Sequence, residues 1–401
     1  MHFEEVFAAL SQHEDEMVAL RHDIHMHPET SYEEHRTSGI VMDKLAEWGI
    51  EAHKGLAGTG VVAVIKGNRP GNRSVGLRAD MDALNMTETN TFGHKSTIPG
   101  KFHGCGHDGH TTMLLSAARY LKANPDFAGT VHCIFQPAEE GGAGGLKMIE
   151  DGLFEQFPCD AVYSLHNKPG LPVGKFITRV GGQLACADTW VVRFKGTGGH
   201  AGAPEKSTDT TIPLAHFILG VQSIVSRNIV AQESAVLTVG MIEAGTSHNV
   251  MPSEIVVTGT ARCHNPVIRD LLEKRLGEVA EACAAMSGCT AELDYQRGYP
   301  PLVNAREQTD IAIAAAAAVA GAENVDGNSA PINAADDFAY MAIARPGCNV
   351  MMGNGDGPEW KNNHMPDYDF NDAIIPWGAA YWVSVVNQEL GGQERETNAA
   401  A

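Results

Sequence analysis

The sequence predicts an α/β protein: a discontinuous domain with a mostly parallel sheet and helices on both faces, plus an inserted α+β sandwich. Short, nearly continuous apolar runs alternate with helical patterns in the first part of the chain, which is typical of buried parallel strands joined by helices. From residue 185 the strands alternate apolar and polar residues, and after Pro300-Pro301 the first pattern returns. We therefore expect one domain from 1–184 and 298–395, an insertion at 185–297, and a disordered tail at 396–401.

The discontinuous domain begins with two amphipathic patterns. Apolar residues at helical spacing predict a helix over 3–26 that ends at His27-Pro28, and a second helix over Ser31–Trp48 that ends at Gly49. Apolar runs bounded by turns and the helical patterns between them predict four strands, at 60–67, 74–84, 130–140 and 160–167, and two helices, at 111–123 and 144–151.

Polar side chains that can bind metals fall at the carboxyl ends of three of these strands. They are Asp80 and Asp82, Glu139 and Glu140, and His166. Ligands bind outside the carboxyl ends of the strands in open α/β sheets. We therefore expect these side chains to share one edge of the sheet.

The insertion and the C-terminal part complete the predicted architecture. The stretches TWVVRFKGTGG, SAVLTVGMIEAG, EIVVTGTARC and TAELDYQRGYP predict strands, and helices are expected at about 209–227 and 266–287. The C-terminal part is expected to contain a helix in REQTDIAIAAAAAVAG, a shorter one in DDFAYMAIARPG, a strand in CNVMMGNG and a closing helix over 371–389.

Composition limits the classes of partner. The formal net charge is −20, which disfavours nucleic acids and anionic membranes because both are polyanionic. No stretch approaches the roughly 20 apolar residues that span a bilayer, and the acidic N-terminus does not resemble a secretion signal. The eight cysteines are scattered, which is not the pattern of a disulfide scaffold. We expect a cytoplasmic enzyme.

One stretch, HGCGHDGH at 103–110, concentrates the residue types that bind metals. Cys105 and His107 stand two apart, so both can face one side of an extended or turning backbone. The intervening glycines let the loop close around an ion. A helical pattern follows from Thr111, so the cluster lies at a helix N-terminus, which favours a thiolate at Cys105. The alternatives are a solvent-exposed histidine-rich loop and a buried cysteine with unrelated histidines nearby.

Three further sites extend this cluster. Glu139 and Glu140 are adjacent at a strand end, where one can bind a metal while the other acts as a base toward water; the alternative is a solvated acidic turn. His166 follows an apolar strand, and His364 lies in the constrained turn NHMPDYDF. Together Cys105, His107, Glu140, His166 and His364 are too many ligands for one tetrahedral zinc and suit two metals that share a bridge.

In these residues the chain resembles the M20 family of metallopeptidases and amidohydrolases. It is similar to the branch that contains hippurate hydrolase, N-acyl-amino-acid amidohydrolases and indole-acetyl-amino-acid hydrolases. The matching stretches run nearly end to end and are RHDIHMHPETSYEE, GLRADMDAL, GCGHDGHTTMLL, FQPAEEGGAGG, LHNKPGLPVG, GGHAGAP, NVMPSE and HMPDYDF. The resemblance implies a zinc-peptidase-like fold and the hydrolysis of N-acyl amino acids to a carboxylate and a free amino acid.

The resemblance also implies roles for individual residues. Cys105 would bridge two metals, with His107, Glu140, His166 and His364 completing the ligand set. Glu139 would be the general base, and Asp82 would orient a ligand without binding the metal. A set of one thiolate, three imidazoles and a carboxylate suits Zn²⁺ as the expected ion, and Mn²⁺, Co²⁺ and Ni²⁺ are alternatives.

The inserted domain is expected to contribute to the site through a second subunit. In dimeric relatives the histidine that matches His200, in GGHAG, reaches the partner's active site and polarises the scissile carbonyl. We therefore expect a homodimer formed through the insertion, with a tetramer as the alternative. Asn249 and Arg262 are candidates for holding a substrate carboxylate, because a planar guanidinium fits a carboxylate.

The sequence departs from the family pattern at three places whose residues could determine which substrate fits. They are Asn85-Met86, the stretch 335–338 and the loop Asp356–Asn362. They leave other functions open. An aminopeptidase would need an acidic anchor for the substrate ammonium group, and none is identified. Hydrolytic deamination could use the same metals. A non-catalytic binding protein is disfavoured because Glu139 and all five candidate ligands are present.

Overall fold

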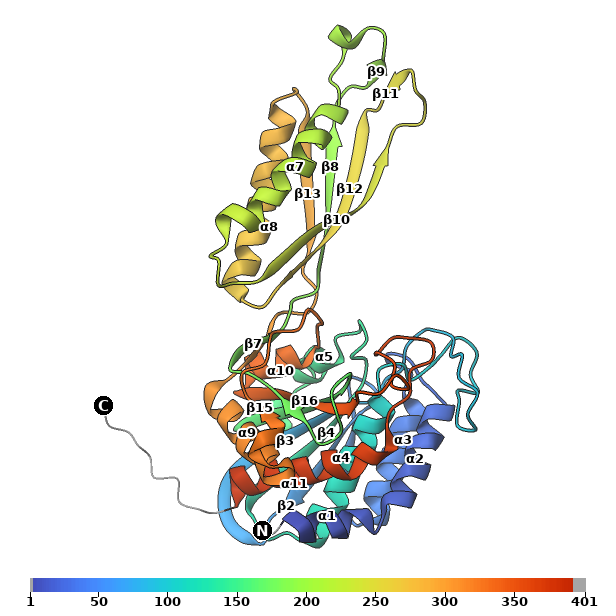
Figure 1. Cartoon of the computed structure of the whole chain (residues 1–401), viewed down its shortest axis with the longest axis vertical. Helices are drawn as coiled ribbons and strands as arrows, with labels where there is room; N and C mark the ends of the chain where they lie inside the picture. The colour runs from blue at the N-terminus through green and yellow to red at the C-terminus, as the bar shows by residue number, and fades with distance from the viewer. Residues whose placement is uncertain (1–2, 392–401) are drawn as a thin grey trace, which may run out of the picture. The chain divides into compact units, whose positions relative to one another are not determined.

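The computed structural model describes residues 3–391, which form two compact units (Figure 1). Within the described residues, unit 1 comprises 3–181, 304–330 and 340–391, and unit 2 comprises 182–303 and 331–339. The stretch 185–297 lies within unit 2, which also takes in 331–339, a segment that we assigned to the other domain. The tail predicted at 396–401 lies outside the described residues.

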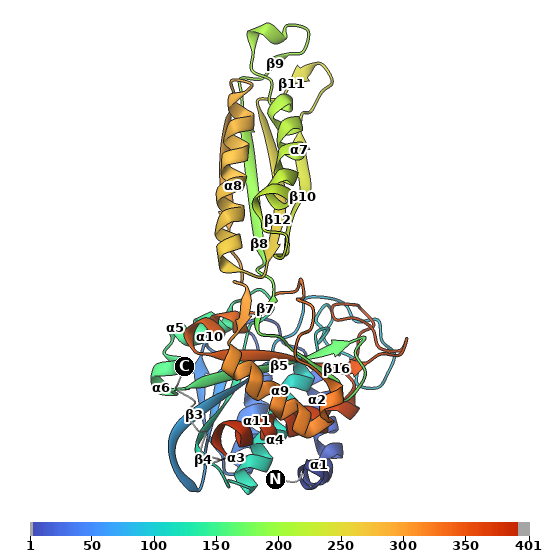
Figure 2. The same ribbon diagram turned by 60° about the vertical axis from the view of Figure 1, so that its left-hand side comes forward.

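Unit 1 is built on an eight-stranded sheet (Figure 2). In spatial order the strands are β1 (Glu51–Leu56), β2 (Gly60–Lys66), β4 (Ala128–Gln136), β3 (Arg69–Asp80), β5 (Ala161–Pro169), β16 (Gly347–Gly355), β6 (Phe176–Ile177) and β15 (Val325–Asp326). The four central strands β4, β3, β5 and β16 run parallel. Strand β1 pairs antiparallel with β2, β2 with β4, and β6 with β16, whereas β15 pairs parallel with β6. The predicted α/β class with a mostly parallel sheet is confirmed.

Helices supply the rest of the unit 1 core. The long helices are α1 (Phe3–Ser11), α2 (Glu14–Met26), α3 (His35–Glu47), α4 (His107–Ala123), α9 (Arg306–Ala320) and α11 (Ile375–Leu390). Helix α11 packs against α4 and α9, and α2 packs against α4. Most of α4 is buried, because it lies among other helices as well as against the sheet. The start of α4 is therefore fixed from several sides.

Short elements connect these helices and strands. They are α5 (Gly144–Glu150), α6 (Leu153–Gln156), α10 (Phe338–Ala344), β7 (Gly181–Leu184), β14 (Leu302–Asn304), η2 (Ala322–Asn324) and η3 (Asp372–Ile374). Strands β7 and β14 pair with each other where the chain passes between the two units. Among residues 3–391 no helix combines the length and apolar character needed to cross a membrane.

Three expectations for unit 1 were wrong in detail. The single helix predicted over 3–26 is divided at Gln12-His13 into α1 and α2. Glu14, Asp15 and Glu16 occupy the first turn of α2, where acidic side chains favour a new helix start. Strand β1 was missed because its residues are mostly exposed, and the strand predicted over 74–84 ends at Asp80.

Unit 2 is the predicted α+β sandwich. Its antiparallel sheet has the order β10 (Ala235–Ala244), β12 (Glu254–Cys263), β8 (Asp188–Lys195) and β13 (Thr290–Gln296). Helices α7 (Thr211–Asn228) and α8 (Pro266–Ala285) pack on it around buried Trp190 and Phe217. A Cβ atom at Gly259 would lie 2.0 Å from the Trp190 ring, so the indole occupies the space of a side chain. A two-stranded ribbon of β9 (Gly199–His200) and β11 (Val250–Met251) and the turn η1 (Pro204–Lys206) complete the unit.

Candidate metal centre

The loop before α4 places two predicted ligands at the start of that helix. Gly106 precedes α4 with φ of 94°, a left-handed conformation that favours glycine. A Cβ atom at this position would lie 2.5 Å from Tyr368 Oη and 2.8 Å from Asn167 Oδ1. A larger residue would therefore displace the loop. The turn places Cys105 immediately before α4 and His107 in its first turn, and both side chains are buried.

The structure brings all five predicted ligands together in unit 1. Ligand atoms of Cys105, His107 and His166 lie within 4.8 Å of one another, and so do those of Cys105, Glu140 and His364. The Cys105 Sγ atom is 3.5 Å from His166 Nε2, and His364 Nε2 is 3.1 Å from Glu140 Oε1. The two groups share Cys105, which is the arrangement expected for a thiolate between two cations.

The donor set fits divalent metal ions. The buried His107 Nε2 atom has no hydrogen-bond partner among the described residues. Its Nδ1 atom lies 3.3 Å from Asp82 Oδ1, so the carboxylate can hold the ring with Nε2 directed to an ion. Ligand atoms at about 2.0–2.3 Å from zinc are separated from one another by at most about 4.6 Å, and the 3.5 Å between Cys105 and His166 and the 3.1 Å between His364 and Glu140 fall within this range.

Electrostatics also favour a cation at this position. Burial lowers the pKa of His107, but the Asp80 carboxylate and Cys105 outweigh burial and raise this pKa well above its usual range. Hydrogen bonds with Cys105 and Glu140 raise the pKa of His364 to about 10. In contrast, burial holds the pKa of His166 well below its usual range. A site that attracts protons to two histidines will also attract a divalent cation.

Glu139 lies beside the predicted ligands. Its side chain is buried, and its carboxylate lies within 4.8 Å of ligand atoms of His107 and Glu140. The Glu140 backbone N–H donates to Asp82 Oδ2 at 2.9 Å. Asp82 therefore contacts both His107 and the turn that carries the two glutamates, as expected of a residue that orients ligands.

His364 is held in a strained backbone conformation. Its φ of 66° lies in the left-handed region, where residues other than glycine are uncommon. Its backbone N–H donates to Gly104 O at 2.8 Å, and Asn363 Nδ2 donates to Cys105 O at 2.8 Å. These bonds tie the C-terminal turn to the loop that carries Cys105, and they position His364 near the other ligands.

A buried polar chain behind the ligands was not assigned from the sequence. His110 Nδ1 lies 2.6 Å from Asp80 Oδ1, and its Nε2 lies 2.9 Å from Asn167 Oδ1. Asp80 in turn accepts from Arg78 at 2.8 Å, and Asn167 contacts the Tyr368 hydroxyl. The signal for His110 was its position three residues after His107, which places both rings on one helix face.

A second buried network lies on the other side of the same helix turn. Arg21 donates to Asp108 Oδ2 and Asp369 Oδ1, both at 3.1 Å, and His25 Nδ1 lies 2.8 Å from Asp108 Oδ2. Burial lowers the pKa of His25, but its bonds to Asp108 and Glu88 outweigh burial and raise the pKa to about 9. Asp108 directly follows His107, so this network fixes the backbone of the ligand loop.

The other three predicted site residues lie in unit 2. His200 in β9 and Asn249 are exposed neighbours, because Ala201 N donates to Asn249 O at 3.0 Å. Arg262 lies near the far end of β12, where its Nη1 atom donates to Thr260 Oγ1 at 2.5 Å and Ala261 O at 2.9 Å. Glu254 begins β12 at the end near β11, and Arg262 lies eight positions further along the strand. This spacing corresponds to a distance of about 26 Å. The structure therefore groups His200 with Asn249 but not with Arg262.

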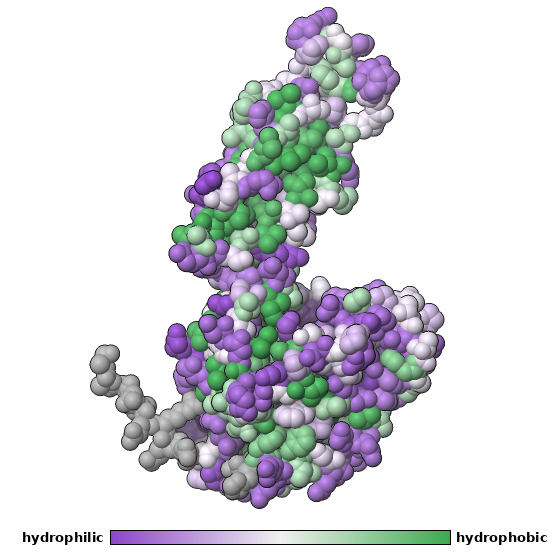
Figure 3. Space-filling view, viewed as in Figure 1, coloured by the Kyte–Doolittle hydropathy of each residue, from purple (hydrophilic) through white to green (hydrophobic). Residues whose placement is uncertain are grey.

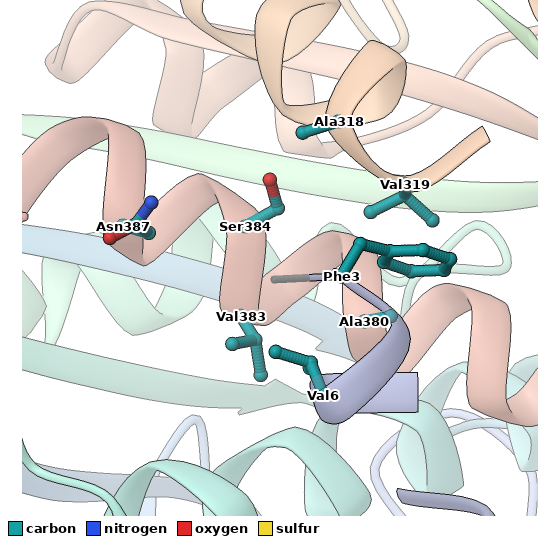
Figure 4. A pocket seen from close by; sticks show the side chains of 8 residues that line it. All are labelled: Phe3, Val6, Ala318, Val319, Ala380, Val383, Ser384 and Asn387. Atoms are coloured by element: carbon teal, nitrogen blue, oxygen red, sulfur yellow. The ribbon is translucent and has the colours of Figure 1, made fainter. Parts of the chain in front are cut away.

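A small cleft elsewhere in unit 1 has a different character. It lies between α1, α9 and α11 (Figure 4). Its lining residues are Phe3, Val6, Ala318, Val319, Ala380, Val383, Ser384 and Asn387. None of these side chains is a carboxylate, histidine or cysteine, which distinguishes this cleft from the candidate metal centre.

Known proteins are similar to this chain in sequence and in fold. Residues 76–388 match the model of peptidase family M20/M25/M40. The chain is 35% identical to hippurate hydrolase of Campylobacter jejuni over 94% of this chain and 97% of that protein, and 37% identical to N-acetyl-L-cysteine deacetylase of Bacillus subtilis over 91% and 86%. A solved structure described as a dinuclear metal-binding M20 peptidase from Bacillus subtilis aligns with a TM-score of 0.82 and 30% identity over 94% of this chain and 98% of that one.

These likenesses extend over both units, and they agree with the resemblance carried by the sequence motifs. The family model matches well over half of the chain, and each of the two relatives is covered over most of its length. The chain therefore belongs to peptidase family M20/M25/M40 and is a metal-dependent hydrolase that acts on amide bonds.

Proposed function

We propose that this chain hydrolyses N-acyl amino acids, with benzoyl, acetyl or aryl-acetyl groups as the acyl part, to a carboxylate and a free amino acid. The observation that carries the proposal is the convergence of Cys105, His107, His166, Glu140 and His364. It occurs in a chain similar to a hippurate hydrolase and to an N-acetyl-L-cysteine deacetylase. The proposed substrates share the N-acyl amino acid class that these two names describe.

We infer two divalent metal ions per chain. Cys105 would bridge them, His107 and His166 would complete one set of ligands, and Glu140 and His364 the other. Zn²⁺ is the expected ion, and Mn²⁺, Co²⁺ and Ni²⁺ are alternatives. When bound, the ions would supply positive charge that polarises the amide carbonyl and makes water more acidic at neutral pH.

Glu139 is the proposed general base. Its buried carboxylate lies close to the ligand atoms of His107 and Glu140, within reach of a water molecule in the cluster. Glu139 would accept a proton from that water and deliver it to the nitrogen of the leaving amine. Asp82 would hold His107 in the tautomer with Nε2 unprotonated, through the Nδ1 contact of 3.3 Å.

His200 is proposed to stabilise the developing charge on the carbonyl oxygen from the partner subunit of a homodimer. Two features of unit 2 support self-association. Strand β10 is an edge of the sheet, and Met241 on β10 and Leu219 on α7 are 57% and 74% exposed. Figure 3 shows hydrophobic residues gathered on the face of unit 2 over α7 and β10. An unpaired strand edge beside exposed apolar side chains favours association with a second copy of the chain. A tetramer is the alternative assembly.

Asn249 and Arg262 are the proposed candidates for binding the substrate carboxylate. Asn249 is exposed beside His200, so it would act together with His200. Arg262 lies about 26 Å away along β12, so within one chain it is an alternative to Asn249, and a substrate would compete there with its bonds to Thr260 and Ala261. All eight cysteines are free and buried, which supports a reducing compartment such as the cytoplasm.

The proposed function is tested by measuring amino acid and carboxylate release from a panel of N-acyl amino acids. The panel includes N-benzoylglycine, N-acetyl amino acids and indole-acetyl conjugates, and the protein is first chelated and then reloaded with Zn²⁺, Mn²⁺, Co²⁺ or Ni²⁺. Metal-dependent release of both products is expected for some members. Ammonia release from aromatic amines without amide cleavage would favour hydrolytic deamination instead, and two bound metals without any turnover would favour a binding protein.

A further inference from the structure

Two cysteines face each other at one end of the unit 2 sheet, apart from the proposed metal centre. Strand β12 ends at Cys263, and the β8–β12 register pairs Ala261 with Asp188. Continuing that register places Cys186 opposite Cys263, and the Cys186 backbone N–H donates to Cys263 O at 2.8 Å. The two Sγ atoms are 3.5 Å apart. Both side chains are fully buried, so they have little freedom to turn away from each other.

This geometry is close to that of a disulfide. Directly opposed, hydrogen-bonded residues of an antiparallel pair have Cα atoms about 5.5 Å apart, within the roughly 4.4–6.8 Å that disulfides span. The sulfur atoms would need to approach by about 1.5 Å to reach bonding distance. The contact between the two thiols lowers the pKa of the Cys186 thiol, so we assign Cys186 as the thiol that attacks first.

We propose that Cys186 and Cys263 form a modification site at which a peroxide oxidises the pair to a reversible cross-strand disulfide. The Cys186 thiolate attacks one oxygen of hydrogen peroxide, the O–O bond breaks, and a sulfenic acid and one water molecule form after protonation. The Cys263 sulfur then attacks the Cys186 sulfur and displaces the sulfenic oxygen as a second water. In total, two thiols are oxidised to one disulfide and one peroxide is reduced to two water molecules.

Access to this buried pair comes from its place in the sheet. It lies at the end of the β8–β12 ladder, because β8 begins at Asp188 and β12 ends at Cys263. Strand ends open with less free energy than strand centres, and hydrogen peroxide is small enough to use such an opening. The new bond would close a covalent loop from Cys186 to Cys263, and this loop contains both His200 and Asn249. The inference does not rest on the proposed function.

The test is a peptide map of the metal-loaded, full-length protein after exposure to excess hydrogen peroxide. Free thiols are then alkylated in denaturant, and the protein is digested without reduction and analysed by mass spectrometry. We expect one linked peptide pair that carries Cys186 and Cys263, lighter by two hydrogen atoms than the sum of the two peptides. The link should disappear after treatment with dithiothreitol, and a Cys283→Ser variant, which changes another buried cysteine of unit 2, should retain it.

Recovery of Cys186 and Cys263 as separate peptides, whether alkylated or over-oxidised, would overturn the inference. In Cys186→Ser, Cys263 should stay alkylatable after peroxide, and in Cys263→Ser no linked form of Cys186 should appear. A disulfide from either remaining thiol to another cysteine would contradict the assigned pairing. The peptide map of the unmodified protein decides the question even if a serine variant fails to fold.

Discussion

His107 in unit 1 and His200 in unit 2 are both proposed to act on one substrate, but the structure holds them in different ways. His107 is 1% exposed, and its ring lies against Asp82 and Asp80. His200 is exposed, and its Nδ1 atom accepts a hydrogen bond from the nearby Gly202 backbone. The proposed ligand His107 is thus oriented by contacts within its own unit. The exposed His200 ring has no carboxylate contact of this kind among the described residues. This difference is expected if a second subunit completes the site in which His200 acts.

The largest expected effect comes from breaking proton transfer in unit 1. Glu139→Gln keeps the shape of the side chain but removes the base, so kcat on the best N-acyl amino acid should fall by about 10²–10⁴-fold. Metal content, measured by atomic absorption, should stay at the wild-type level. The exposed Glu155→Gln variant serves as a control with unchanged kcat. Wild-type turnover in Glu139→Gln would remove Glu139 from the mechanism.

The proposed role of His200 across subunits can be tested with mixed variants. His200→Asn should lower kcat by about 10²–10³-fold, the usual effect of losing one donor to a developing oxyanion. Mixing this variant with Glu139→Gln should restore activity, because a mixed dimer has one site without either change. At random mixing the recovered activity should be about one quarter of wild type for a symmetric dimer. Activity equal to the sum of the separate variants, or a monomer in sedimentation, would contradict the role across subunits.

The buried network around Asp108 in unit 1 predicts a pH dependence of stability. The pKa of His25 is raised from 6.5 to about 9 in the folded chain. The contribution of protonated His25 to the free energy of unfolding is therefore fully present below about pH 6.5 and is lost as the pH rises through about 9. The loss is on the order of 3 kcal/mol. Urea unfolding at pH 6 and pH 9.5 should show this loss in the wild type and a smaller loss in His25→Gln. The exposed His216→Gln variant in unit 2 should follow the wild type, and an equal loss in His25→Gln would refute the assignment.

A smaller effect is expected from loosening one ligand of the metal centre. Asp82→Asn weakens the contact with His107 Nδ1, so metal affinity should fall by about 10–100-fold. Competition with a chromophoric chelator measures this change, and the exposed Asp126→Asn variant is the matched control. Unchanged affinity would mean that Asp82 does not orient a ligand.

Much of the candidate site could be predicted because its residues follow local rules. Cys105 and His107 are close in sequence, and Glu140 and His166 are carried by parallel strands whose carboxyl ends meet at one edge. His364 was found through its constrained turn and the family resemblance. The class of each unit followed from the change in apolar spacing at residue 185. The division of the first helix was missed because the apolar spacing continues across Gln12-His13.

The supporting contacts could not be predicted in the same way, because they join distant parts of the chain. Arg21 contacts Asp108 and Asp369, and no local pattern indicates which buried acid an arginine will meet. No pattern in the sequence assigns a role to Asn167, although its amide links His110 to Tyr368. Sequence patterns thus located the groups proposed to perform the chemistry, and the tertiary structure supplied the residues that hold them in place.

A titration of activity against bound metal tests whether the proposed pair of metal ions carries the hydrolysis. The chelated protein is reloaded stepwise with Zn²⁺, and hydrolysis of the best N-acyl amino acid is recorded together with the number of ions bound per chain. The account predicts no hydrolysis in the metal-free protein and a rise in activity that levels off at two ions per chain. Full activity after complete chelation, or two bound ions without hydrolysis of any N-acyl amino acid, would contradict it.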